Sequence, residues 1–218
     1  MVNENFTVNT VLKKLEKVFP KPVEPTGKTG ANVFQQLVSV MLSAQSKDSN
    51  TVKAARQLFN VADTPEKILG LSEETMKELI KPSGLYNIKT VNIKRMCKVL
   101  LEDFDGKVPE TREKLMSLPG VGRKSADIML RFAFNRDAIA VDTHVFRLTK
   151  RLGVVEGNTE EKVAAYLDKN VDTSLRKNAH MLLVTFGRET CKARAPKCGE
   201  CVFKNECVFY KTVSVQKK

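Results

Sequence analysis

The sequence has no long uninterrupted apolar run, and its N-terminus has no basic segment leading into an apolar stretch. A membrane-spanning helix needs about 20 consecutive apolar residues, and a secretory leader needs the basic and apolar segments together. We therefore expect neither membrane insertion nor secretion, but a cytoplasmic protein with no membrane partner. The lack of an N-terminal targeting extension favours a bacterial or archaeal cytoplasm.

Convincing strand pairs, internal repeats and long flexible linkers are also missing. Apolar residues instead recur at helical spacing from Val8 to Phe19 and again from Phe34 to Leu42. Thr64, followed by proline and glutamate, and Ser72, followed by two glutamates, read as N-caps of further helices. The sequence predicts an all-α fold, and this punctuation alone does not divide the chain into two domains.

Acidic residues are few compared with basic ones. The chain has 25 Asp and Glu against 37 Lys and Arg, which gives a formal net charge of +12. A surplus of this size attracts polyanions, so nucleic acid is the first partner to consider. Many basic proteins use such charge only to stay soluble, and charge alone does not separate the two possibilities.

Cysteine is scarce outside one segment near the C-terminus. Cys97 stands alone in a helix expected over Ile88–Leu101, where it is expected to be a small buried hydrophobe. The other four follow the spacing C-x6-C-x2-C-x5-C, at Cys191, Cys198, Cys201 and Cys207. Four soft ligands so close together favour a metal over disulfides, and their chemistry suits zinc and an iron–sulfur cluster equally.

Residues 111–134 predict two helices joined by the tight turn Leu118-Pro-Gly-Val-Gly122. Its two glycines let the backbone approach a ligand, and the N-terminus of the second helix offers free N–H groups and a positive dipole end. Together with the charges of Arg123 and Lys124, this suits a DNA phosphate. The alternative is an ordinary connection between helices with a glycine cap.

Lys124 and Asp142 are the candidate reactive pair. Lys124 lies in the first turn of the second helix, where the dipole favours the neutral, nucleophilic amine, and Asp142 is placed to cap the next helix as an ionised carboxylate. Together they suit Schiff-base chemistry at a sugar C1′. The alternative is a solvated lysine and a capping Asp142-Thr143 pair, and spacing does not show that the two residues meet. His144 is either a cap-region residue or a phosphate contact, whereas His180 is expected to pack.

With these motifs in order, the chain resembles the endonuclease III family over nearly its whole length. Leu118–Asp127 is similar to the helix-hairpin-helix of that family, and Ala140–His144 is similar to its catalytic aspartate segment. The cysteine spacing is similar to its cluster signature. Leu42–Asp48 and Gly84–Lys89 resemble the loops with which the family fills the space left by a flipped nucleotide.

The resemblance implies two helical domains with a DNA cleft between them. One is a six-helix barrel domain over residues 26–136 that includes the hairpin, and the other is a cluster domain formed by residues 1–25 and 137–218. The four clustered cysteines would hold a [4Fe-4S] cluster. Lys124 would be the nucleophile that displaces a damaged base and forms the Schiff base, with Asp142 as its electrostatic and proton-transfer partner.

The resemblance also implies a set of DNA contacts. Backbone amides near the hairpin glycines would hold a phosphate, Gln45 would enter the space of the flipped base, and Leu85 would wedge the opposite strand. The basic cluster loop would grip the DNA backbone. The full set of DNA-contacting residues is Gln45, Leu85, Gly120, Gly122, Thr143, His144, Lys192 and Arg194.

The function implied is that of a bifunctional DNA glycosylase and lyase of base excision repair, acting as a monomer on the nucleoid. It would remove oxidised or ring-saturated pyrimidines, such as thymine glycol, from double-stranded DNA and cleave abasic sites by β-elimination. One alternative is a glycosylase without lyase activity, but such relatives typically lack the hairpin lysine and usually carry a further C-terminal domain, whereas this chain ends soon after Cys207. The other alternative is a non-catalytic iron–sulfur DNA-binding protein, which would have no need of Lys124 opposite Asp142.

Overall fold

The computed structural model describes residues 6–20 and 31–215. The chain divides into two compact units, a terminal unit of Met1–Thr26 with Arg136–Lys218 and a central unit of Gly27–Asn135. The domain boundary expected between residues 25 and 26 lies outside the described residues. All secondary structure in the described ranges is helical, which confirms the all-α prediction. Over these ranges, no helix has the length and apolar character needed to cross a membrane.

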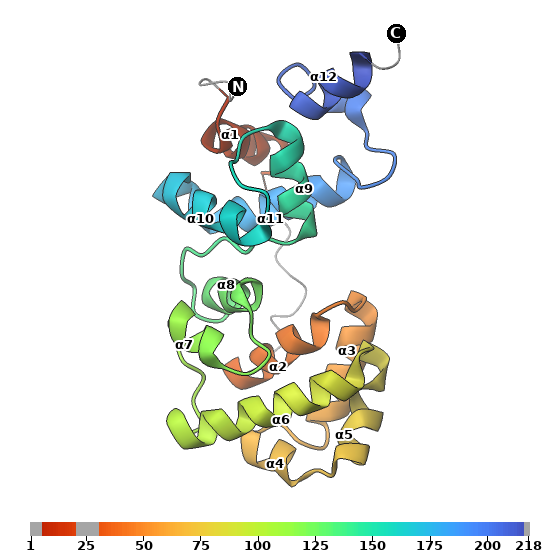
Figure 1. Ribbon diagram of the computed structural model, residues 1–218, viewed down its shortest axis with the longest axis vertical. Helices are drawn as coiled ribbons and strands as arrows, with labels where there is room; N and C mark the ends of the chain where they lie inside the picture. The colour runs from red at the N-terminus through yellow and green to blue at the C-terminus, as the bar shows by residue number, and fades with distance from the viewer. Residues whose placement is uncertain (1–5, 21–30, 216–218) are drawn as a thin grey trace. The chain divides into compact units, whose positions relative to one another are not determined.

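The central unit is built around its longest helix, α6, which contacts α2, α4 and α5 (Figure 1). Helix α2 also packs on α3 and on α8, the second helix of the hairpin. The α-helices of this unit are α2 (Val33–Ser43), α3 (Asp48–Phe59), α4 (Pro65–Gly70), α5 (Glu73–Ile80), α6 (Tyr86–Asp103), α7 (Arg112–Ser117) and α8 (Arg123–Phe132), with the 3-10 turn η1 (Lys81–Ser83) before α6.

Local capping fixes where several of these helices begin. The side chains of Thr64 and Ser72 accept hydrogen bonds from the third residues of α4 and α5, as the sequence predicts, and Pro65 fills the first position of α4. Asn32 and Gln35 form a reciprocal capping box at the start of α2. These caps set the first residues of α2, α4 and α5 and so the ends of the loops that precede them.

The terminal unit is assembled from both ends of the described chain. Helix α1 packs on α10 and α11, while α9 contacts α10, α11 and α12 (Figure 1). The elements are α1 (Val8–Val18), α9 (Thr143–Leu152), α10 (Glu160–Asn170), α11 (Thr173–Glu189), the 3-10 turn η2 (Cys198–Glu200) and α12 (Val208–Val215). Their buried side chains form one apolar cluster, so a single core holds the first helix against the cysteine-containing segment.

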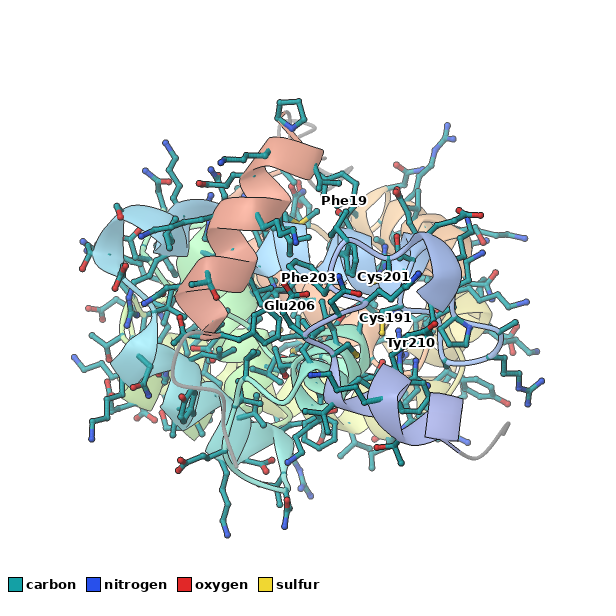
Figure 2. All side chains as sticks on the ribbon, turned by 90° about the horizontal axis from the view of Figure 1, so that it is seen from above. Phe19, Cys191, Cys201, Phe203, Glu206 and Tyr210 are labelled. Carbon is teal, nitrogen blue, oxygen red and sulfur yellow. The ribbon has the colours of Figure 1, made fainter. Side chains whose placement is uncertain are left out.

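Aromatic contacts bring α1 and its flanks onto the cysteine-containing segment. The Phe203 ring lies 6.0 Å from that of Phe6 and 5.3 Å from that of Phe186, measured between centroids. Lys14 of α1 donates from Nζ to the carbonyl oxygen of Val202 at 2.6 Å. Figure 2 labels Phe203 together with Cys191 and Cys201. The first helix therefore covers the loop that carries the candidate metal ligands.

Candidate functional site

The hairpin of the central unit consists of α7, a tight turn and α8. Thr111 caps α7 through its hydroxyl, as expected for a helix starting there. Helix α8 follows Gly122, an N-cap residue that has no side chain to accept from the first-turn amides. The free N–H groups and the dipole make this terminus suitable for an anion. Lys124, the second residue of α8, is exposed beside it.

The two hairpin glycines have different local environments. Gly120 has φ +80°, and a Cβ at this position would lie 2.9 Å from Cβ of Asn92 and 3.0 Å from Cε of Met41. Packing and backbone conformation therefore already require glycine there. Gly122 has no heavy atom within 4 Å of the position of a Cβ. Open space above its backbone leaves the α8 terminus accessible, and a phosphate contact at either glycine stays a prediction.

A buried carboxylate ties the two hairpin helices together. Asp127 of α8 is fully buried, and its Oδ1 accepts a hydrogen bond from Nε of Arg112, at the start of α7, at 2.7 Å. Its Oδ2 lies 3.5 Å from Nε of Arg123. Sequence reasoning gave Asp127 no role, although an acidic residue on the apolar face of a helix was a visible signal. The contact fixes the first turn of α8, which carries Lys124.

Two candidate DNA-contacting residues of the central unit lie in the left-handed backbone region. Gln45, in the turn between α2 and α3, has φ +51°, and Leu85, which precedes α6, has φ +48°. Both side chains are exposed, Leu85 to 51%. Asp105 and Asn135 also have positive φ, but these residue types tolerate that region, whereas glutamine and leucine rarely adopt it. Strained, exposed residues of this kind indicate function more than stability.

In the terminal unit, Asp142 is the N-cap of α9. Its Oδ1 accepts hydrogen bonds from the backbone N–H groups of His144 at 2.9 Å and Val145 at 2.8 Å. The predicted capping role is confirmed. No described residue donates a hydrogen bond to Oδ2. One carboxylate oxygen is thus fixed by the helix, and the other is available to a ligand.

The two residues after Asp142 differ in exposure. Thr143 is exposed at the first position of α9. His144 is half-buried, and its Nδ1 lies 3.3 Å from Nη2 of Arg147. Burial is the main cause that lowers the pKa of His144 below its ordinary value, and the cations of Arg147 and Arg188 act in the same direction. A neutral imidazole is therefore favoured, and DNA contact by either residue stays a prediction.

Two arginines of α9 hold the start of the cysteine loop. Arg147 donates from Nε to the carbonyl oxygen of Cys191 at 3.0 Å. Arg151 donates from Nη1 to the carbonyl oxygen of Lys192 at 2.7 Å and from Nη2 to that of Ala193 at 3.1 Å. Sequence reasoning gave neither arginine a role. Their i,i+4 spacing puts them on one helix face, but it does not reveal acceptors some 40 residues further along the chain.

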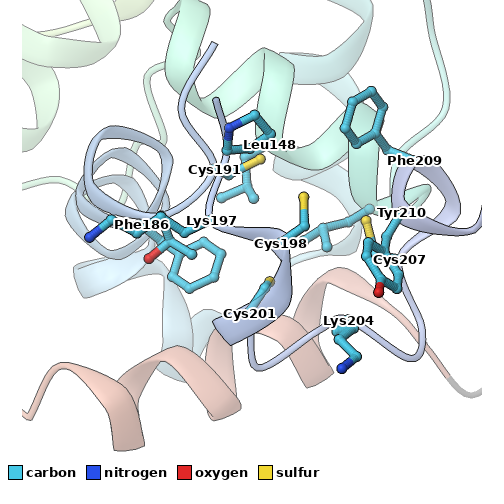
Figure 3. Close-up of a pocket in the computed structure, with 13 residues that line it drawn as sticks. Leu148, Phe186, Cys191, Lys197, Cys198, Cys201, Lys204, Cys207, Phe209 and Tyr210 are labelled. Carbon is cyan, nitrogen blue, oxygen red and sulfur yellow. The ribbon is translucent and has the colours of Figure 1, made fainter. Parts of the chain in front are cut away.

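The four clustered cysteines line one pocket of the terminal unit, together with mainly apolar side chains (Figure 3). All four are free thiols, as is Cys97. Burial raises the pKa of the Cys201 and Cys207 thiols, so binding of a metal must displace their protons. The lining residues that Figure 3 labels are Leu148, Phe186, Cys191, Lys197, Cys198, Cys201, Lys204, Cys207, Phe209 and Tyr210.

The four thiols form one donor set around the pocket. Zinc binds thiolates at roughly 2.3 Å, so its ligands must converge on one point. Among the described residues, no three His, Cys, Asp or Glu side chains are grouped to hold one metal ion. The pocket has an empty volume of about 340 Å³, open solvent included, with all four cysteines around it. This donor set fits an iron–sulfur cluster.

The remaining predicted residues have the expected exposure: the DNA-contact candidates are exposed, and the residues expected to pack are buried. Lys192 and Arg194 are exposed on the cysteine loop. Cys97 is fully buried in α6, which raises the pKa of its thiol to about 12 and confirms its structural role. His180 is buried in α11, with Nδ1 2.9 Å from the carbonyl oxygen of Ala140. It supports the segment that leads to Asp142.

Comparison with known families and proteins bears on these sites. Residues 38–173 match the HhH-GPD superfamily of base excision DNA repair proteins, and residues 191–207 match the iron–sulfur binding domain of endonuclease III. Endonuclease III of Rickettsia conorii is 42% identical over 202 residues, covering 92% of this chain and 96% of the relative. Endonuclease III of Escherichia coli K12 is 40% identical over 205 residues, covering 94% and 96%.

Solved structures give the same result. A non-covalent complex of endonuclease III with DNA is similar with a TM-score of 0.88 and 34% identity, covering 96% of this chain and 99% of that one. A trapped covalent intermediate of endonuclease III with DNA has the same scores and coverage. A thermostable thymine-DNA glycosylase shares the fold, with a TM-score of 0.77 and 21% identity.

These matches confirm the resemblance inferred from the motifs. The protein is a base excision repair enzyme, a DNA N-glycosylase and abasic-site lyase, that binds DNA. Its cofactor is a [4Fe-4S] cluster. The chain belongs to the endonuclease III family, within the HhH-GPD superfamily of base excision DNA repair proteins.

Proposed function

We propose that the enzyme releases oxidised or ring-saturated pyrimidines, such as thymine glycol, from duplex DNA and then cuts the abasic strand through a Schiff base on Lys124. The observation that carries this proposal is an exposed amine in the first turn of α8, a helix whose N-cap residue is a glycine without a capping side chain. A phosphate bound at that terminus would hold the damaged nucleotide beside the amine. One relative was captured as a covalent intermediate with DNA, and a lysine amine would supply such a bond here.

In the proposed reaction, the neutral amine of Lys124 attacks C1′ of the damaged nucleotide, and the bond from C1′ to the base breaks with the base as leaving group. The C1′–O4′ bond then opens, a proton passes from the lysine nitrogen to O4′, and the resulting imine acidifies the C2′ protons. Removal of one of them expels the 3′ phosphate and cuts the strand, and hydrolysis of the imine returns the lysine. Asp142 would stabilise the developing positive charge or transfer a proton through Oδ2, because Oδ1 is already bound by two amides.

Contacts to DNA would come from both units. In the central unit, amides near Gly120 and Gly122 would hold a phosphate, Gln45 would fill the space of the extruded base, and Leu85 would wedge the opposite strand. Extrusion costs a few kcal/mol, least for damaged bases that stack poorly. In the terminal unit, Lys192 and Arg194 would contact the DNA backbone, and Thr143 and His144 would also contact the DNA. We propose that the protein acts as a monomer. We also propose that it acts on nucleoid DNA, since the relatives are bacterial.

We further propose that Cys191, Cys198, Cys201 and Cys207 hold the cluster. When bound, the cluster supplies metal–thiolate bonds that close a short loop with no core of its own. The chain prepares this loop, because Arg151 donates from Nη1 to Sγ of Cys191 at 3.6 Å and the Phe203 amide donates to Sγ of Cys201 at 3.5 Å. Hydrogen bonds of this kind orient the sulfur atoms that would bind iron.

Borohydride trapping tests the proposal. Purified protein is incubated with a labelled duplex that contains one thymine glycol, with borohydride present. Wild type should become covalently linked to the DNA, because borohydride reduces the imine to a stable amine. Lys124→Gln should lose the link and keep DNA binding. Lys114→Gln is the matched control, since it removes the same charge from an exposed residue of the same hairpin.

Three results would decide between the candidate activities. A covalent link in wild type and Lys114→Gln, but not in Lys124→Gln, supports the lyase with Lys124 as nucleophile. Release of the base without strand cleavage or trapping would make the protein a glycosylase alone. Binding with neither reaction, on thymine glycol and on a preformed abasic site, would leave a non-catalytic DNA-binding protein.

A further inference from the structure

Lys89 of α6 is a lysine on the buried face of its helix. Only 5% of its surface is exposed, and it lies at i, i+4, i+7 and i+11 with Ile93, Met96 and Leu100, which are fully buried. Burial lowers the pKa of its ammonium. A buried lysine is costly unless its donors are used, so its presence among core residues needs a specific reason.

The Lys89 ammonium binds two loop ends of the central unit. Nζ donates to the carbonyl oxygen of Leu42 at 2.7 Å and to that of Ser83 at 2.9 Å. Leu42 lies in the last turn of α2, and Ser83 is the last residue of η1. Carbonyl groups at helix ends lack partners within the helix and attract cations. One ammonium therefore joins the ends of two segments that are about forty residues apart in the sequence.

Each of these segments leads directly into a strained residue. Gln45 follows Leu42 by three positions, and Leu85 follows Ser83 by two. The turn before Gln45 has Ala44 at φ −57° and ψ 120°, a type II arrangement that normally has glycine where Gln45 stands. Leu85 has φ 48° and ψ 28°. Left-handed conformations at such residues persist only when the surrounding structure holds them in place.

We infer that Lys89 is a positioning residue, which fixes the Gln45 turn and the Leu85 turn to one another and so sets the separation of the two side chains proposed to enter DNA. The DNA part of this inference rests on the proposed function. Two groups that enter one duplex must arrive at a fixed separation, and rigid support lowers the cost of that arrangement. A lysine suits the position because its ammonium has three donors and no acceptor.

The same helix provides a matched control. Lys94 is also partly buried, and its Nζ donates to the carbonyl oxygens of Leu69 and Leu71, at the end of α4. Replacing either lysine by methionine removes an ammonium that binds two carbonyl oxygens, with little change in side-chain length. Only Lys89 joins the turns of Gln45 and Leu85. Differences between the variants therefore report on these turns and not on the general loss of a buried charge.

The first measurement is amide hydrogen exchange without DNA. In Lys89→Met, the turn amides of Ser46 and Gly84, which donate to Ser43 and Lys81, should exchange faster than in wild type. In Lys94→Met they should exchange as in wild type. Lys89→Gln, which keeps an N–H donor, is the second variant should Lys89→Met fail to fold. Wild-type exchange at both turns in the Lys89 variants would overturn the inference, whatever the activity of the enzyme.

The second measurement compares base release with cleavage of a preformed abasic site, both under single-turnover conditions. Lys89→Met should slow release of thymine glycol roughly ten- to a hundredfold, as expected for misplaced groups. Cleavage of the abasic site should change much less, because no base must be extruded. Lys94→Met should keep the wild-type ratio of the two rates. An equal loss of both rates in Lys89→Met, or no loss, would contradict the positioning role, whereas a wild type without either activity would instead contradict the proposed function.

Discussion

Gln45 has a backbone conformation that glycine would adopt without strain. Its φ of +51° costs a residue with a Cβ about 1 kcal/mol, and its side chain is exposed. Gln45→Gly should therefore be about 1 kcal/mol more stable than Gln45→Ala, which keeps the strain. Both variants should release thymine glycol more slowly than wild type, because neither can fill the space of the flipped base. Urea unfolding and single-turnover release measure the two effects.

The alanine variant separates backbone from side chain in this experiment. Equal stability of Gln45→Gly and Gln45→Ala would mean that the turn relaxes and stores no strain. Base release at the wild-type rate in both variants would instead remove Gln45 from the proposed DNA contacts. The stability comparison therefore tests the backbone strain, and the rate of base release separately tests the DNA contact.

His144 should make folding sensitive to acid. Its folded pKa is lowered, mainly by burial, so the unfolded chain binds a proton at higher pH than the folded protein does. As the pH falls below the unfolded value of 6.5, the unfolded state gains protons first and the free energy of unfolding decreases. His144→Asn should show a smaller loss between about pH 7.5 and 5.5 than wild type, measured by urea unfolding. An identical loss in both proteins would contradict this role.

At the scale of elements, the hairpin depends on an ion pair that joins its two helices. The Asp127 carboxylate of α8 forms ion pairs with Arg112, at the start of α7, and with Arg123, in the first turn of α8. Since α7 has only six residues, its own hydrogen bonds contribute little, and this contact fixes its orientation. The position of Lys124 thus depends on residues at both ends of the motif.

Asp127→Asn should weaken the hairpin specifically. The amide keeps the shape of the side chain but removes the buried negative charge that Arg112 and Arg123 face, so stability should fall by about 1–3 kcal/mol. Borohydride trapping should slow at temperatures where the protein stays folded, because the first turn of α8 is no longer held. Asp63→Asn is the control, since it breaks an exposed pair with Lys67 that should contribute little to stability. Equal effects in calorimetry would show that Asp127 acts as a surface charge.

Local signals in the sequence predicted much of this architecture. Thr64, Ser72 and Asp142 are N-caps as predicted, because a cap depends on residues within one turn of it. The carbonyl acceptors of Lys89 and Arg151 could not be predicted in this way, since they lie up to 47 positions away and are backbone groups that every residue type has. A charged residue on a buried helix face gave the only local hint of Lys89.

At the scale of the whole molecule, the two ends of the described chain belong to the same unit. Helix α1 packs on α11, and Asn9 at its start donates to Asp172 at 2.8 Å. Lys14 reaches the cysteine loop, so residues at the beginning of the chain help to bury a site made by residues near its end. The central unit is inserted between these segments in sequence. Folding of the terminal unit therefore requires contacts of very long sequence separation, and a bound cluster would stabilise the last of them.

Cys207→Ser and Cys97→Ser should separate metal binding from core packing in the intact protein. Cys207 lines the cluster pocket, so its replacement should lower the iron content and the visible absorbance of the purified protein and make the cysteine loop sensitive to protease. Cys97 is fully buried in the central unit and does not line the pocket, so a serine hydroxyl there should cost about 1–3 kcal/mol without any loss of iron. Wild-type iron content in Cys207→Ser would exclude Cys207 as a ligand, and iron loss in Cys97→Ser would mean that the central unit controls cluster binding.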